Sequence, residues 1–198
     1  MAKGYVNLKL IKELIAKSRT LRQATREEII KVFIKNKIEM IAEFDNHPVT
    51  KEIEEGITAK NGSKTLSGYG NLFSFIGFNQ GETPIQKLRD LLIEKTDIDI
   101  TPEIKTNDEE ISYMYLIILP NQKEIEEATQ MPWENGKSWA LSIEKGISGF
   151  SNYVNGQFIM SRSDGGIQSD HIVDKRNFKP VFYLTEIFKN FERKFRNS

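Results

Sequence analysis

A glycine-rich stretch that runs into an apolar segment, residues 60–78 (KNGSKTLSGYGNLFSFIGF), most constrains how this chain can fold. Glycines in such a loop indicate backbone that bends sharply or passes close to a neighbour. Residues 72–78 are apolar at most positions, which predicts a mostly buried strand. We therefore expect a contact loop that leads into the central sheet. The glycines of the stretch are Gly62, Gly68, Gly70 and Gly77.

Helical periodicity dominates the residues before this loop. Apolar side chains recur at helical spacing through residues 6–46, but residues 18–23 are polar. Thr25 and Glu28 have the spacing of a capping box, so one long helix and two shorter helices are both compatible with the pattern. Pro48 predicts the end of the helix just before it. The first part has little to pack against nearby, which suggests an arm that docks on a neighbouring subunit.

Helices and strands are mixed in the rest of the chain. Thr83, Pro84 and Gln86 are a strong helix start for residues 84–95. We predict further helices at 122–131 and 180–195, a hairpin of strands 98–105 and 111–119, a strand at 138–144, and a weak strand signal at 158–160. Residues 111–119 carry the strongest strand signal, so we expect that strand to be central.

The predicted fold class is α+β, with a mixed and mostly antiparallel sheet packed by helices and an N-terminal helical arm. The arm spans residues 1–47, and the α+β domain spans residues 48–198, with long loops at 56–71 and 145–177. A loop as long as the second is usually functional in a small domain.

Charge is distributed unevenly along a chain whose formal net charge is zero. Residues 1–40 hold ten Lys and Arg against four Asp and Glu, residues 41–170 hold 11 against 21, and residues 171–198 hold seven against three. Basic ends and an acidic middle fit solvated helix faces, contact with nucleic acid, or head-to-tail self-association. No apolar run approaches the ~18 residues that span a bilayer, so we expect no membrane partner.

No catalytic constellation stands out, and we expect no cofactor, no metal and no enzymatic activity. The chain has no cysteine, and neither His47 nor His171 lies near a nucleophile motif. The enzyme alternative is a small metal-dependent nuclease or another nucleic-acid-processing enzyme, because Glu103-Ile104-Lys105 reads E-x-K and follows two aspartates. A monomeric binding module is the third possibility.

Four segments carry short motifs: Phe44–Thr50 (FDNHPVT), Gly70–Ile76 (GNLFSFI), Trp139–Gly146 (WALSIEKG) and Phe178–Tyr183 (FKPVFY). These motifs resemble those of the neck or tail-completion proteins of tailed bacteriophages. The resemblance implies a non-enzymatic subunit of a six- or twelve-fold ring at the head–tail junction of the virion, with DNA passing through its lumen and non-specific DNA contact there. Its partners would be other neck, portal-adaptor or tail proteins.

For such a ring we predict contact surfaces at residues 68–75, at 145–153 and in the loop 155–175. Deletion of residues 156–172 should impair docking and leave the fold intact. The individual residues that we expect in subunit or partner contacts are Gly68, Tyr69, Gly70, Asn71, Leu72, Trp139, Glu144, Gly146, Phe150, Arg162 and Phe182.

Overall fold

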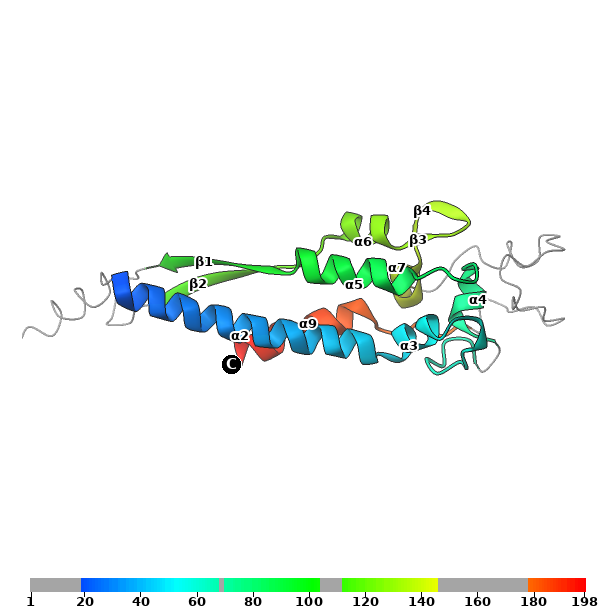
Figure 1. The fold of residues 1–198 in the computed structure, drawn as a ribbon, viewed down its shortest axis with the longest axis horizontal. Helices are drawn as coiled ribbons and strands as arrows, with labels where there is room; N and C mark the ends of the chain where they lie inside the picture. The colour runs from blue at the N-terminus through cyan, green and yellow to red at the C-terminus, as the bar shows by residue number, and fades with distance from the viewer. Residues whose placement is uncertain (1–18, 68–69, 104–111, 146–177) are drawn as a thin grey trace, which may run out of the picture.

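The computed structural model describes residues 19–67, 70–103, 112–145 and 178–198. The molecule is elongated, with the long helix α2 (Arg19–Asn46) running along one side (Figure 1). A hairpin of strands β1 (Asp97–Glu103) and β2 (Ser112–Ile118) extends beside one end of α2, and α3 (Pro48–Glu54) and α4 (Leu72–Ile76) lie at the opposite end. The α+β class and the N-terminal helix are confirmed.

Helix α2 is continuous through Thr25, which excludes the alternative of a second helix that begins there, and residues 6–18 of the predicted helical span lie outside the described residues. The predicted end of the helix before Pro48 is confirmed, because α2 ends at Asn46. His47 then caps α3, with its Nδ1 accepting a hydrogen bond from the backbone N–H of Val49. The short 3-10 helix η1 (Gly56–Thr58) follows.

The apolar run after the glycine-rich loop forms helix α4, so the predicted buried strand is wrong. Asn71 caps α4 by accepting a hydrogen bond from the N–H of Ser74, and Gly77 ends the helix at φ +88°. A short apolar run fits a buried helix as well as a strand, and these two caps decide between them. The expectation of burial is confirmed, since every residue of α4 is buried.

Helix α5 (Pro84–Lys95) and the β1–β2 hairpin are confirmed, but the hairpin is a two-stranded antiparallel sheet of its own. The expectation that residues 111–119 form a central strand is therefore wrong. One face of the hairpin packs inward, where Tyr115 contacts Phe195 edge to face. The opposite face is open to solvent, and Leu116 on it is 65% exposed.

The chain continues with α6 (Gln122–Ala128), which begins with a complete capping box of Asn121 and Glu124. The short strands β3 (Gln130–Met131) and β4 (Glu134–Ser138) form a second antiparallel pair. Residues 139–145 form helix α7 (Trp139–Lys145), so the strand predicted at 138–144 is wrong. Ser138 caps this helix by accepting a hydrogen bond from the N–H of Leu141.

Helix α9 (Leu184–Arg196) closes the chain and packs along α2. It begins later than predicted, because residues 178–183 are not helical. Phe33 of α2 contacts the rings of both Phe191 and Phe195, at centroid distances of 5.9 and 6.1 Å. This part of α2 therefore belongs to the same hydrophobic core as α9, together with Met40 and Phe44.

Candidate functional site

The four segments that carry the family resemblance meet at one end of the molecule. The ring of Phe75 in α4 stacks on Phe178, with a centroid distance of 5.8 Å. The N–H of Lys179 donates to the carbonyl of Thr65, and the N–H of Val181 donates to that of Ile143. Residues 178–183 thus connect the glycine-rich loop with α7. We call the described residues of these four segments the convergent end.

A buried carboxylate organises the glycine-rich loop. Glu52 of α3 is 2% exposed and accepts hydrogen bonds from Asn61 Nδ2 at 2.9 Å, from Ser63 N at 2.8 Å and from Leu72 N at 2.8 Å. No cation partner of Glu52 is found within the described residues, so these N–H donors compensate its desolvation. The carboxylate thereby holds both ends of the loop against α3.

The same loop stores backbone strain. Lys64 and Ser67 adopt the left-handed region, with φ of +60° and +54°. Non-glycine residues rarely do so unless the surroundings fix them, and such residues gather at functional sites. Here the fixing contacts are those of Glu52 and the hydrogen bond between the Ser63 and Thr65 hydroxyls.

A second carboxylate fixes the start of α9. Glu144 of α7 accepts hydrogen bonds from the N–H groups of Tyr183 and Thr185 at 3.1 and 2.7 Å, and from the Thr185 hydroxyl at 2.6 Å. Beside this carboxylate, Phe182 is 69% exposed. The backbone is therefore held firmly while a large apolar side chain is presented to solvent.

Tyr183 joins residues 178–183 to the end of α2 and to α3. Its hydroxyl oxygen is 2.7 Å from that of Thr50. Its ring stacks on Phe44, and its ring centroid lies 4.8 Å from that of His47. Burial raises the pKa of the Tyr183 hydroxyl well above its usual value. Burial also lowers the pKa of His47, although the carboxylates of Glu186 and other residues act against that change.

The residues predicted as contacts take different positions in the structure. Leu72 and Trp139 are buried in the core, and Asn71 and Glu144 make the internal hydrogen bonds described above. Gly70 is exposed and has φ +69°. Gly68, Tyr69, Gly146, Phe150 and Arg162 lie outside the described residues, as do the predicted loop 155–175 and the weak strand at 158–160.

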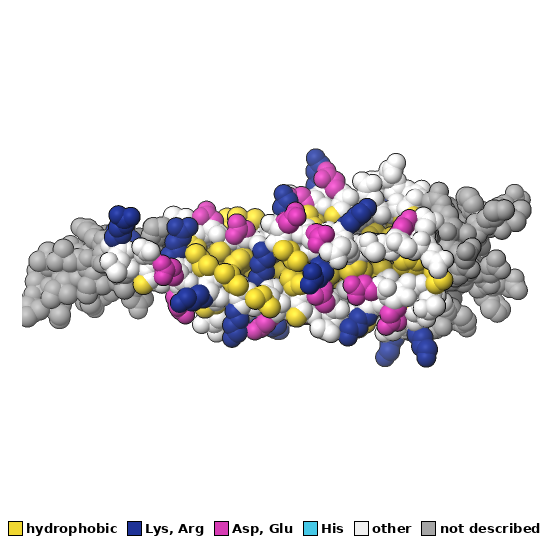
Figure 2. All heavy atoms as spheres, in the orientation of Figure 1, with side chains coloured by type: hydrophobic (Ala, Val, Ile, Leu, Met, Phe, Trp, Pro, Cys, Tyr) yellow, Lys and Arg dark blue, Asp and Glu magenta, His cyan; other side chains and the backbone are white. Residues whose placement is uncertain are grey.

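Away from the convergent end, an apolar groove of about 430 Å³ runs between α2 and α5. Figure 2 shows hydrophobic side chains gathered along the middle of the molecule, with a few Lys and Arg among them. Helical spacing in the sequence does not distinguish the isoleucines of α2 from Phe33. The structure separates them, because Phe33, Met40 and Phe44 face the core whereas Ile34 and Ile38 are exposed.

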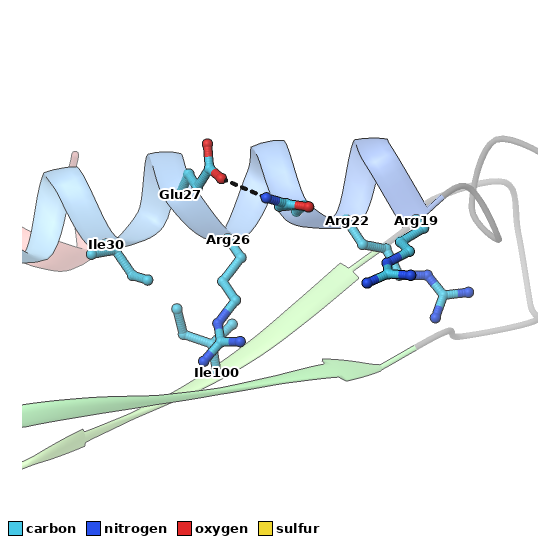
Figure 3. A pocket seen from close by; sticks show the side chains of 7 residues that line it. Arg19, Arg22, Arg26, Glu27, Ile30 and Ile100 are labelled. Carbon is cyan, nitrogen blue, oxygen red and sulfur yellow. Dashed lines mark hydrogen bonds between the residues drawn. The ribbon is translucent and has the colours of Figure 1, made fainter.

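An open cationic pocket of about 520 Å³ lies between α2 and β1. Figure 3 shows Arg19, Arg22 and Arg26 extending from α2 toward the hairpin, where Ile100 of β1 lies beside Arg26. Glu27 on the same helix accepts a hydrogen bond from Gln23 at 3.0 Å. Guanidinium groups at this spacing suit carboxylate or phosphate oxygens.

Comparisons with protein-family models, curated proteins and solved structures gave no match. Among the described residues, no three His, Asp or Glu side chains are grouped so as to hold a metal ion. The described helices also include none that is long and apolar enough to cross a membrane. The side chains of Glu103 and Lys105, on which the nuclease alternative depends, are outside the described set.

Proposed function

We propose that this chain is a virion structural protein of the neck or tail-completion type. In this proposal it forms a ring at the head–tail junction of a tailed bacteriophage and lets DNA pass through the lumen. It acts without catalysis, and its partners are further copies of itself and other neck, portal-adaptor or tail proteins.

The convergence of the four motif segments is the observation that carries the proposal. The four segments are far apart in sequence, yet their described residues are joined by Tyr183, by Phe75 with Phe178, and by the backbone hydrogen bond from Val181 to Ile143. Short motifs that match by chance need not lie together in the folded chain. Motifs that belong to one functional unit are expected to lie together.

The exposed apolar surface also supports a subunit that assembles. Large hydrophobic side chains at least 39% exposed occur on α2, on α5 and in the segment before α9. Apolar patches of this kind mark interaction surfaces when they are contiguous. Different surfaces on one chain suit a heterologous interface, which closes into a ring when its rotation allows.

The cationic pocket gives the lumen contact a specific candidate. Arg19, Arg22 and Arg26 occupy one side of α2 near its N-terminal end. In a ring they would approach the DNA backbone without reading its sequence, so binding should weaken steeply with added salt.

Negative-stain imaging of the purified full-length chain tests the proposal. Closed rings with a central opening support it. The nuclease alternative instead predicts separate single subunits and magnesium-dependent DNA cleavage that is lost in Glu103→Ala and Lys105→Ala. That result would replace the proposal.

A further inference from the structure

Within the described residues, no apolar segment fills the groove between α2 and α5. Its apolar lining comes from Ile34, Ile38, Ile41 and Ala42 of α2 and from Ile93 of α5. Ile34, Ile38 and Ile93 are 50%, 64% and 39% exposed. Two helices that present isoleucines to one groove form a site for the apolar face of a third helix.

The polar groups of the groove already have partners. Arg89 pairs with both carboxylate oxygens of Asp45, at 2.9 and 3.1 Å, and Lys37 Nζ donates to the Thr96 carbonyl at 2.7 Å. Because both cationic groups already donate hydrogen bonds within the chain, we do not expect the groove to bind a small anion. What an occupant gains here is apolar burial.

The charges beside the groove favour a basic occupant. Asp90 and Glu94 are exposed on α5, three residues before and one residue after Ile93. A helix lying along the isoleucines would place its flanking side chains near these carboxylates. Lysines at those positions would add complementary charge at the rim of the contact.

A segment of this chain has the required pattern. Residues 8–15 (LKLIKELI) carry Leu10, Ile11, Leu14 and Ile15 at helical spacing, and lysines at 9, 12 and 17 surround them. These residues lie outside the described part of the chain. Their apolar side chains match the lining of the groove, and their lysines complement Asp90 and Glu94 on the α5 side of it.

Chain length prevents this segment from docking in its own groove. Ile15 is four residues from Arg19, and four extended residues span about 14 Å at most. Ile34 is fifteen residues along α2 from Arg19, a rise of about 22 Å. A helix of residues 8–15 extends about 10 Å beyond Ile15, whereas Ile38 lies about 28 Å from Arg19, so this helix cannot lie along both Ile34 and Ile38 of the same chain.

We propose that the α2–α5 groove of one subunit binds residues 8–15 of a second copy. The inference rests on the proposed function and deepens it by assigning one subunit contact. The arm and the groove are different surfaces, so the contact is heterologous and repeats from one subunit to the next.

Site-specific cross-linking tests the contact, and the absence of native cysteines makes the readout clean. A full-length Leu14→Cys chain carrying a mass tag is mixed with an untagged Ile38→Cys chain and oxidised. The matched control replaces Ile38→Cys by Leu116→Cys, because Leu116 on the outer face of the hairpin is 65% exposed against 64% for Ile38. We expect at least tenfold more tagged–untagged dimer with Ile38→Cys.

Equal yields of tagged–untagged dimer with the Ile38→Cys and Leu116→Cys chains would overturn the inference. A predominance of dimers cross-linked between two Ile38→Cys chains would also overturn it, because it would indicate a symmetric contact between two grooves. Absence of any cross-link would also overturn it. Circular dichroism confirms that each variant is folded, which the exposure of both positions leads us to expect.

A second comparison separates this inference from the proposed function. Ile38→Glu should reduce the oligomer mass of the full-length chain, and Leu116→Glu should not. If both variants still form rings, the arm-in-groove contact is overturned and the ring proposal stands. If Leu14 and Ile38 cross-link but no ring forms, the contact stands and the ring proposal falls.

Discussion

The buried hydroxyl groups of Thr50 and Tyr183 lie 2.7 Å apart and join α3 to the start of α9 across 133 residues of sequence. Both residues are fully buried. If one hydroxyl is removed, the other is too buried to form a replacement hydrogen bond with water. This pair is therefore a sensitive probe of how firmly the convergent end is held.

Thr50→Val should destabilise the protein by about 1–3 kcal/mol, because it keeps the side-chain shape but leaves the Tyr183 hydroxyl without this partner. Urea unfolding of Thr50→Val, Tyr183→Phe and the double variant measures the effect. We expect the double variant to lose less stability than the two single changes together. Strict additivity would show that the two hydroxyls are not coupled.

His47 should make stability fall on acidification. Burial lowers its pKa in the folded protein below the ordinary value of 6.5, so the unfolded state binds the proton more readily. The contribution is fully present above pH 6.5 and is lost as the pH falls below it. In the folded protein Nδ1 accepts a hydrogen bond from Val49, which protonation at that atom would break.

His47→Asn is the control, since asparagine can cap α3 but does not titrate. Chemical unfolding at pH 7.5 and pH 5.5 should show a larger loss of stability for the wild type than for His47→Asn. An equal loss in both proteins would assign the pH dependence to other groups.

Glu52→Gln should loosen the glycine-rich loop at a cost of about 1–3 kcal/mol. The amide of glutamine presents a donor where the carboxylate now accepts from Ser63 N and Leu72 N. Glu54→Gln is the matched control on the same helix, because Glu54 is exposed, and it should change stability by no more than about 0.5 kcal/mol. Hydrogen exchange of residues 61–72 should accelerate in Glu52→Gln alone, and unchanged exchange would contradict the role of this carboxylate.

Elements with explicit terminal signals could be predicted from the sequence. The cap of Asn121 and Glu124 on α6, the proline start of α5 and the stop before Pro48 all appear in the structure. The two segments that were predicted as strands but form helices α4 and α7 are short and largely apolar. At that length tertiary contacts and capping decide the structure, and hydrophobic periodicity does not.

The candidate site was predictable only in part. Asn71 and Glu144 were selected from the motif resemblance, but their hydrogen bonds to Ser74 and Thr185 depend on the fold. Glu52 was missed because an acidic residue on a short amphipathic helix carries no signal of burial. Helical spacing could not show that Ile34 and Ile38 face outward, because both lie close to the core-facing Phe33 on α2.

Phe182 should matter for assembly and not for folding. Its ring is 69% exposed, whereas Phe191 on the helix that follows is 1% exposed. Phe182→Ser should leave the free energy of unfolding within about 0.5 kcal/mol of wild type. Phe191→Ala should cost about 3–5 kcal/mol through a core cavity.

Thermal unfolding and sedimentation of both variants distinguish these roles. Under the proposed function, Phe182→Ser remains folded but assembles less readily than wild type. A destabilised Phe182→Ser, or one that assembles normally, would remove Phe182 from the contact surface.

The mass of the full-length chain in solution, measured by light scattering over a range of concentrations, tests the central claim most directly. The account predicts a discrete species of six or twelve times the chain mass of 22.8 kDa. A mass of one chain at every concentration, with or without magnesium and DNA, would contradict it.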